Sequence, residues 1–141
     1  MREREDCPKY VTWQAREGLE LLLTFAEEAG QLEQDWEYVA GDPERIDEFL
    51  NVYEQAELTI DERFALMIII ISSYDDWLST ASESRDEWPR IAAHLVRNSS
   101  IHWNTVEYWS LLDEDDPENW WPSAPLMRGI WEEYRQCPEI V

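Results

Sequence analysis

Hydrophobic residues recur at helical spacing along most of the chain. In residues 10–29, 31–39 and 43–56 they lie three or four positions apart, and a glycine follows soon after each of the first two stretches. This spacing places apolar side chains on one face of a helix, and glycine commonly follows a helix end. The Asp42-Pro43 pair indicates a helix start, because aspartate caps a first turn that tolerates proline. Three helices are therefore predicted here.

The most hydrophobic segment is residues 64–71, which contain four consecutive isoleucines. A surface helix would have a polar face, and this segment has none, so we expect it to be the central buried element. A buried strand would also suit the isoleucines. Apolar residues continue to Leu78, however, beyond the usual length of a strand, and a helix is predicted. The segment is too short to cross a bilayer, which takes about 20 apolar residues.

A pair of helices is predicted after this buried element. Ser84 and Glu87 have the spacing of a capping box, in which a hydroxyl and a carboxylate three residues later cap the same helix start. Apolar residues at helical spacing continue from there to Val96, and a second such pattern covers residues 101–112. Because a short polar segment separates the two patterns, we expect the two helices to form an antiparallel pair.

The chain ends with a predicted loop and a last helix. Residues 113–122 have no period and contain two prolines, which indicates a loop, and residues 126–134 carry one apolar stripe. The chain has 141 residues, no internal repeat and no break in composition, which favours one domain. The sequence therefore predicts an all-α fold, an irregular or orthogonal bundle of five to six helices, with one domain over 1–141 and loosely ordered ends at 1–9 and 138–141.

The chain is strongly acidic. Its 32 acidic and 11 basic residues give a formal net charge of -21. A field of this sign repels nucleic acid and anionic membrane surfaces, and it attracts cationic proteins and speeds their encounter. We therefore expect a basic protein partner and no direct binding to nucleic acid or to membranes. The alternative is that the charge serves only solubility.

The two cysteines, Cys7 and Cys137, lie near the two ends of the chain, which often approach each other in a domain. The charged first residues are unlike a secretory signal peptide, so a cytoplasmic location is expected. In that compartment two free thiols are favoured over a disulfide, although a bridge is geometrically possible. Lys9 is the only lysine, and this preference for arginine indicates a GC-rich, bacterial source.

Motifs of enzyme chemistry are largely missing. The two histidines lack the Glu-x-x-His spacing of helical di-metal sites, and no serine, cysteine or glycine-rich catalytic motif is present. Glu17-x-x-Glu20 and Glu44-x-x-Asp47 resemble the carboxylate pairs of all-α nucleoside triphosphate pyrophosphohydrolases, which hold Mg²⁺ against a triphosphate. In so acidic a chain, solvated helix faces produce the same spacing by chance. We expect no enzymatic activity, no metal and no cofactor.

Two acidic segments are candidate partner-binding surfaces. The first contains two consecutive tryptophans, which are frequent at binding hot spots and which cannot both enter a core easily. Alternatively, one indole fills the core and the acids solvate the turn. The second is the most negative region of the chain and could form an extended anionic face. The predicted partner-binding residues are Asp113, Glu114, Asp115, Asp116, Glu118, Trp120 and Trp121 in the first segment, and Glu33, Asp35, Glu37, Asp42, Glu44, Asp47 and Glu48 in the second.

Three segments, residues 64–70, 101–109 and 125–131, combine helical spacing with aromatic residues in an acidic chain. In this style the sequence resembles small helical immunity proteins of bacterial polymorphic and contact-dependent toxin systems. The resemblance implies a cytoplasmic inhibitor that binds one toxin, often a basic nuclease, and covers its active site or a neighbouring surface. The leading hypothesis is thus a toxin-neutralising immunity protein. The alternatives are an acidic nucleic-acid mimic or adaptor, and the Mg²⁺-dependent pyrophosphohydrolase.

Overall fold

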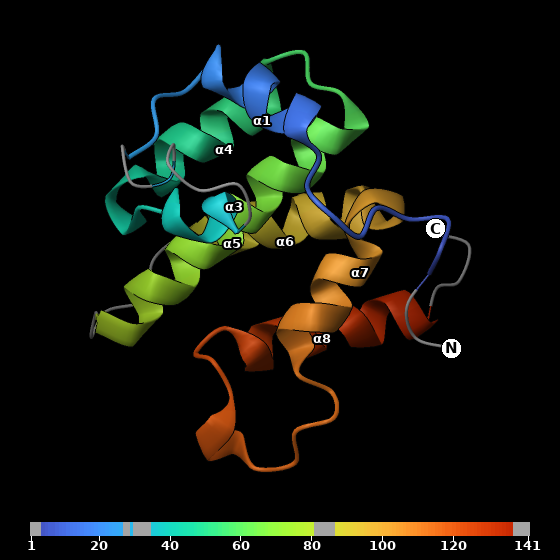
Figure 1. Cartoon of the computed structure of the whole chain (residues 1–141). Coiled ribbons are helices and arrows are strands. Elements are labelled where there is room, and N and C mark those ends of the chain that lie inside the picture. The colour runs from blue at the N-terminus through green and yellow to red at the C-terminus, as the bar shows by residue number, and fades with distance from the viewer. Residues whose placement is uncertain (1–3, 27–28, 30–34, 81–86, 137–141) are drawn as a thin grey trace. The chain divides into compact units, whose positions relative to one another are not determined.

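A computed structural model describes residues 4–26, 29, 35–80 and 87–136 of the chain. Within these residues there are seven α-helices and two short 3₁₀ helices, and no β-strand (Figure 1). The all-α prediction is confirmed, and the number of helices exceeds the five to six expected. The elements in chain order are α1 Trp13–Glu20, α3 Trp36–Val39, η1 Pro43–Arg45, α4 Ile46–Gln55, α5 Ile60–Thr80, α6 Glu87–Arg97, α7 Ser99–Ser110, η2 Pro117–Asn119 and α8 Ala124–Gln136.

The chain forms two compact units, in each of which the residues lie close to one another in space. Unit 2 is Tyr10–Asp76, and unit 1 consists of Met1–Lys9 together with Trp77–Val141. Each unit has its own buried apolar residues. The expectation that residues 1–141 act as one domain stays a prediction.

Helix α5 contains the longest run of buried residues in unit 2. A capping box fixes its start, because the Thr59 hydroxyl accepts from the Glu62 N–H at 3.1 Å and the Glu62 carboxylate accepts from the Thr59 N–H at 2.8 Å. Every residue from Phe64 to Tyr74 is buried. The hydrophobic run therefore forms a buried helix, as its length and composition predict.

Helix α1 is shorter than the stretch 10–29 that the spacing predicts. It ends at Glu20, and only some of the apolar residues that follow reach the interior of unit 2. Leu23 is buried, and the Phe25 ring lies 5.7 Å from the Trp36 ring. Leu22, which the helical spacing places on the buried face, is 47% exposed, so the spacing overestimates both the length of the helix and the burial of this stretch.

Unit 2 also buries a charged side chain, Arg16. Its guanidinium carbon lies 5.1 and 5.2 Å from the ring centroids of Trp13 and Trp36, and its Nη2 donates to the Ala29 carbonyl at 3.0 Å. Two aromatic faces and a carbonyl thus replace the water that the cation loses. Trp13 has this structural role although 57% of it is exposed.

In unit 1, helix α7 packs chiefly against α8. The Trp103 ring of α7 stacks on the Tyr134 ring at 5.2 Å and meets the Trp131 ring edge-on at 5.0 Å. Asn98 alone separates α6 from α7, whereas an antiparallel helix pair needs a connection of about two to five residues. The chain therefore turns directly from α6 into α7, which differs from the antiparallel pair expected from the sequence.

The first described residues of the chain are fixed to α7 by one side chain, Asn104. Its Nδ2 donates to the carbonyls of Arg4, Cys7 and Pro8 at 2.8, 3.2 and 3.2 Å, and its Oδ1 accepts from the Arg4 N–H at 2.8 Å. Residues 4–8 are thus hydrogen-bonded to α7. The loose order expected of 1–9 and 138–141 stays a prediction, since 1–3 and 138–141 lie outside the described residues. Cys7 is a buried free thiol whose pKa is raised by burial. Cys137 lies outside the described residues.

Candidate partner-binding loop

The connection between α7 and α8, residues 111–123, carries the first predicted surface and is named here the acidic loop (Figure 1). Helix α7 ends where Leu111 adopts the left-handed conformation, with φ 47° and ψ 52°. Such a residue commonly stops a helix, although the conformation is unfavourable for leucine. Further on, the Asp116 side chain accepts from the Glu118 N–H at 3.0 Å and caps η2. The predicted loop is confirmed, and it consists of a series of local turns.

Arg128 of α8 fixes the start of the acidic loop. Its Nε donates to the Ser110 carbonyl at 2.8 Å, and its Nη2 donates to the carbonyls of Leu111 and, at 3.1 Å, Glu114. Carbonyls at the C-terminal end of a helix carry partial negative charge and favour a cation. The guanidinium also lies over the Trp120 ring, 3.8 Å from its centroid. One side chain therefore ties the loop to α8.

Both tryptophans of the loop are half-buried, and both indole N–H groups are used inside the protein. Trp120 donates to the Glu114 carbonyl and Trp121 to the Trp109 carbonyl, each at 2.9 Å. The Trp121 ring also lies 5.7 Å from the Tyr108 ring and 5.2 Å from the Trp109 ring. The sequence left two alternatives open: both tryptophans are exposed and bind a partner, or one indole fills the core. The structure is intermediate, with each ring anchored and part of its surface exposed.

Five carboxylates lie on the acidic loop. Glu114 is half-buried, and its Oε1 accepts from the Asp116 N–H at 3.1 Å and from the Asn119 side-chain amide at 3.3 Å. This carboxylate therefore organises the turn that follows it. The other four are exposed: Asp113, Asp115, Asp116 and Glu118.

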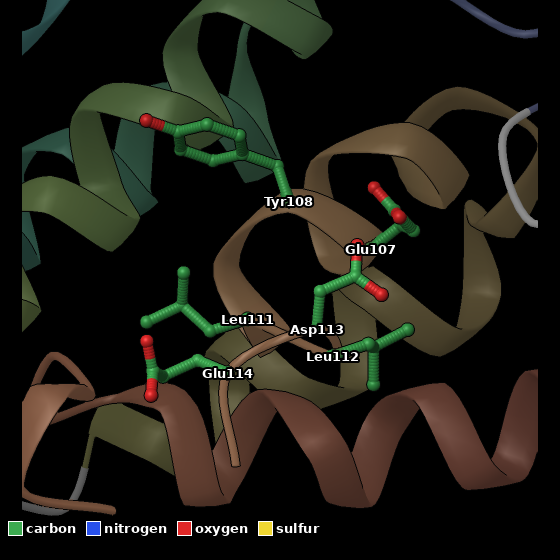
Figure 2. A pocket seen from close by; sticks show the side chains of 6 residues that line it. All are labelled: Glu107, Tyr108, Leu111, Leu112, Asp113 and Glu114. Atoms are coloured by element: carbon green, nitrogen blue, oxygen red, sulfur yellow. The ribbon is translucent and has the colours of Figure 1, made fainter. Parts of the chain in front are cut away.

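A shallow pocket of about 300 Å³ opens beside the start of the acidic loop. Figure 2 shows the Asp113 side chain extending from the loop toward Glu107 of α7, with Glu114 beside Leu111. Half of Tyr108 is exposed at the same place. The pocket thus combines carboxylates with apolar and aromatic surface. Its lining residues are Glu107, Tyr108, Leu111, Leu112, Asp113 and Glu114.

The second predicted surface is less continuous than the sequence suggests. Glu33 lies outside the described residues. Asp42 is half-buried and caps η1 by accepting from the Glu44 N–H at 3.0 Å. Arg45 donates to both carboxylate oxygens of Glu48 at 2.8 and 2.9 Å, and this hydrogen bonding lowers the pKa of Glu48. Several of these acids thus serve local structure. The exposed ones are Asp35, Glu44, Asp47 and Glu48.

Glu37 departs most from the prediction of an exposed anionic face. It is buried, with 7% of its surface exposed, and its Oε1 has no hydrogen-bond partner among the described residues. Burial raises the pKa of this carboxyl, and the charge of Asp35 adds to the rise. Helix α3 has only 4 residues, which is too short for hydrophobic spacing to show which face is buried. Glu37 is therefore removed from the candidate surface.

The carboxylates of the alternative magnesium site are described but not gathered. Glu17 accepts from an indole at 2.7 Å, Glu20 lies 3.8 Å from the Arg16 guanidinium, and Glu44 and Asp47 are exposed. Within the described ranges, no group of three or more His, Cys, Asp or Glu residues could hold a metal ion. The geometry therefore adds nothing to the spacing that suggested a pyrophosphohydrolase.

No protein-family model, curated protein or solved structure matches this chain. None of the described helices is long and apolar enough to cross a membrane. The chemistry of the acidic loop and its pocket is thus the main guide to function.

Three residues of the candidate site were not singled out as binding residues from the sequence: Arg128, Glu107 and Tyr108. A signal for Arg128 did exist, since it is the only arginine between Arg97 and Arg135 and closely follows the acidic segment. Glu107 and Tyr108 lie in the last turn of α7, and Leu111 directly follows that helix in the left-handed conformation. Helical spacing alone therefore does not place these residues beside the acidic loop.

Proposed function

We propose that this protein binds a basic protein partner through the acidic loop and neutralises it, as an immunity protein occludes a toxin. The observation that carries the proposal is the preformed loop, with four exposed carboxylates beside two half-buried indoles. A surface that is already ordered loses little conformational entropy on binding. Carboxylates orient an approaching cationic protein, and aromatic rings supply contact area at the centre of an interface.

The charge of the whole chain supports a cationic partner. At a net charge of -21, attraction extends over about one Debye length, or about 8 Å at physiological ionic strength. Encounter with a basic protein is therefore fast at low salt and slower at high salt. The exposed acids of the second segment contribute to this long-range attraction, while the acidic loop provides the contact surface.

The proposal is tested with the polypeptide encoded by the adjoining gene as candidate toxin. It is expressed in a bacterial host with and without this protein, and growth is measured. We expect wild type to restore growth and the triple variant Asp115→Asn, Asp116→Asn, Glu118→Gln to fail. The matched control, Glu5→Gln, Glu57→Gln, Glu133→Gln, removes the same charge from exposed positions outside the loop and is expected to restore growth.

Measuring the affinity for the purified partner distinguishes the contribution of the acidic loop from that of overall charge. The triple loop variant is expected to raise Kd by about tenfold, since each exposed ion pair contributes up to about 1 kcal/mol, and the control triple to raise it far less. Equal effects of both triples, or an adjoining polypeptide that neither harms cells nor binds, would contradict the proposal. Displacement of this protein from its partner by duplex DNA would indicate a nucleic-acid mimic instead.

A further inference from the structure

We propose that the exposed face of α1, formed by Trp13, Glu17 and Leu21, is a second docking surface, which binds a basic amphipathic helix of another protein. This face belongs to unit 2, whereas the acidic loop belongs to unit 1, so the inference goes beyond the proposed function. Among the described residues, seven of the eight large exposed hydrophobic side chains lie in unit 2. Four of these seven lie within residues 10–22, in and beside α1. A single exposed apolar residue needs no explanation, but such a concentration marks an interaction site.

The three residues of the α1 face line up along the helix because they are four positions apart. Leu21 directly follows the last residue of α1 and keeps helical dihedral angles, φ -75° and ψ -22°, so its side chain continues the same face. Trp13 and Leu21 are therefore about 12 Å apart along the helix axis. The opposite side of the helix is buried and includes Ala15 and Leu19.

The Trp13 indole is held in a fixed position on this face. Its Nε1 donates to Glu17 Oε1 at 2.7 Å, and the Arg16 guanidinium carbon lies 5.1 Å from the ring centroid. Despite these two contacts, 57% of Trp13 remains exposed. A tryptophan that is already ordered loses little conformational entropy on binding, and it offers a large apolar area, as tryptophans at binding hot spots do.

Leu21 supplies the second apolar group of the face. It is the most exposed large hydrophobic residue that the structure describes, with 87% of its surface in solvent. At this exposure it contributes little to the core of unit 2. An apolar side chain of a partner that covers Leu21 removes both groups from water, which is favourable in proportion to the area buried. Trp13 and Leu21 are therefore two anchor points for apolar residues of one partner segment.

The polar residues of α1 select the charge of that segment. Glu17 and Glu20 are exposed, whereas Arg16, the only basic residue of α1, is buried. A segment that packs on Trp13 and Leu21 therefore meets carboxylates beside its apolar residues, which favours Lys or Arg at its flanks. A second copy of this chain is disfavoured, because its net charge of -21 gives repulsion. A basic amphipathic helix fits, since apolar residues seven positions apart on it span about 10 Å.

The test is an NMR titration of the ¹⁵N-labelled full chain with a peptide of about 18 residues, long enough to form a helix. The peptide consists of lysine, alanine and leucine, with all leucines on one helical face. One control has the same composition with the leucines scattered around the helix, and a second has glutamate in place of every lysine. We expect the first peptide to shift amides concentrated at residues 13–22, the scattered peptide to bind more weakly, and the acidic peptide not to bind.

Two variants assign the apolar contact. Leu21→Ala removes an exposed side chain, so the fold is retained, and it is expected to raise Kd for the amphipathic peptide about tenfold. Val39→Ala is the matched control, because Val39 is an exposed aliphatic residue of α3 in the same unit. It is expected to change Kd less than about twofold, as surface substitutions outside a contact do.

Two further variants assign the charge. Glu17→Gln removes a charge from the α1 face but keeps an oxygen that can accept from the Trp13 indole. It is expected to raise Kd about two- to fivefold, the effect of one exposed ion pair. Glu133→Gln removes the same charge from an exposed position on α8 and is expected to leave Kd nearly unchanged. Amide spectra of each variant show whether the fold is retained.

The outcomes separate this inference from the proposed function. Shifts spread over acidic residues throughout the chain, equal binding of the scattered peptide, or equal effects of Leu21→Ala and Val39→Ala would overturn the α1 surface. Shifts confined to the acidic loop would also overturn it and would leave the proposed function standing. Shifts localised at residues 13–22 that require the leucine stripe support the α1 surface whatever the growth assay shows, because the two surfaces belong to different units and are altered by different variants.

Discussion

At the scale of single residues, Arg128 connects stability to the candidate surface. Three backbone carbonyls accept from its guanidinium, and the Trp120 ring covers one face of that group. Carbonyls at a helix end need a partner, and here a side chain of the next helix provides it in place of water. The geometry of the acidic loop therefore depends on a residue that need not touch the partner.

Replacing Arg128 by alanine is expected to destabilise the protein by about 2–4 kcal/mol, because several charge-assisted hydrogen bonds are lost together. Urea unfolding measures this change. Arg128→Lys is expected to recover little, since one ammonium cannot reproduce the planar contact with three carbonyls and a ring. Arg135→Ala is the control, because its exposed pairing with Glu132 at 3.3 Å contributes at most about 0.5 kcal/mol. Equal effects of the two alanine variants would contradict the role given to Arg128.

The buried carboxyl of Glu37 is expected to make stability depend on pH. Its pKa is raised in the folded protein, chiefly by burial, so the folded state favours the protonated form. Stability is therefore lost as pH rises from the unfolded value, about 4.3, through the raised folded value. Glu37→Gln is expected to raise the free energy of unfolding at pH 7 and to lose this advantage below about pH 4.

Chemical denaturation across pH measures the effect of Glu37→Gln. Glu44→Gln removes the same charge from an exposed position, and it reports how much of any gain comes from relief of overall repulsion. A gain at pH 7 no larger than that of Glu44→Gln would show that burial of the Glu37 carboxylate costs the fold nothing.

At the scale of elements, helix α7 holds the first described segment of the chain through Asn104. Asn104→Ala removes the side-chain partner of four backbone groups in residues 4–8. We expect faster amide exchange in this segment and a loss of about 2–3 kcal/mol. Thr105→Val on the same helix is the control, since the Thr105 hydroxyl is buried with no hydrogen-bond partner among the described residues. Unchanged exchange in residues 4–8 would contradict the anchoring role.

The elements could be predicted where one physical signal dominated. Helix α5 followed from a hydrophobic run too long for a strand, and the start of η1 followed from Asp42 before Pro43. Helix α1 was predicted too long, because the helical spacing continues after Glu20 although Leu22 is exposed and Leu23 is the only buried residue in 21–26. Where a helix ends depends on tertiary packing, which no local pattern encodes.

The candidate site could be predicted only as a segment. The carboxylates and indoles of residues 113–121 stand out by composition, so the loop itself was found. The pocket, in contrast, needs Leu111 in the left-handed conformation and Arg128 on three carbonyls. Every residue has a backbone carbonyl. The sequence therefore does not show which carbonyls will accept from the Arg128 side chain. Glu37 was misassigned for a related reason, since a one-turn helix has no measurable period.

At the scale of the whole molecule, self-repulsion is the dominant electrostatic effect. A net charge of -21 opposes compaction of the folded chain. Raising NaCl from about 10 to 300 mM is expected to stabilise the protein by about 1 kcal/mol, or about 4 °C in Tm, because the Debye length falls below the spacing of most charges.

Calorimetry at several NaCl concentrations measures this gain. Screening is expected to level off near physiological ionic strength, whereas general salt effects on hydrophobic burial keep increasing with concentration. A Tm that does not change with salt, or that falls, would contradict this prediction. It would mean that favourable charge interactions in the folded protein already balance the repulsion between carboxylates.

The acidic loop is held in its shape by hydrogen bonds within the chain, from Arg128 and from its own two indoles. A fixed template of this kind cannot adjust to a ligand whose basic residues are displaced by a few ångströms, so mismatched candidates are rejected by unpaired charge. Under the proposed function, discrimination among closely similar partners resides in residues 111–123, while Arg128 behind them stays constant. Exchanging this short segment between two proteins of the proposed kind is then expected to exchange their partners.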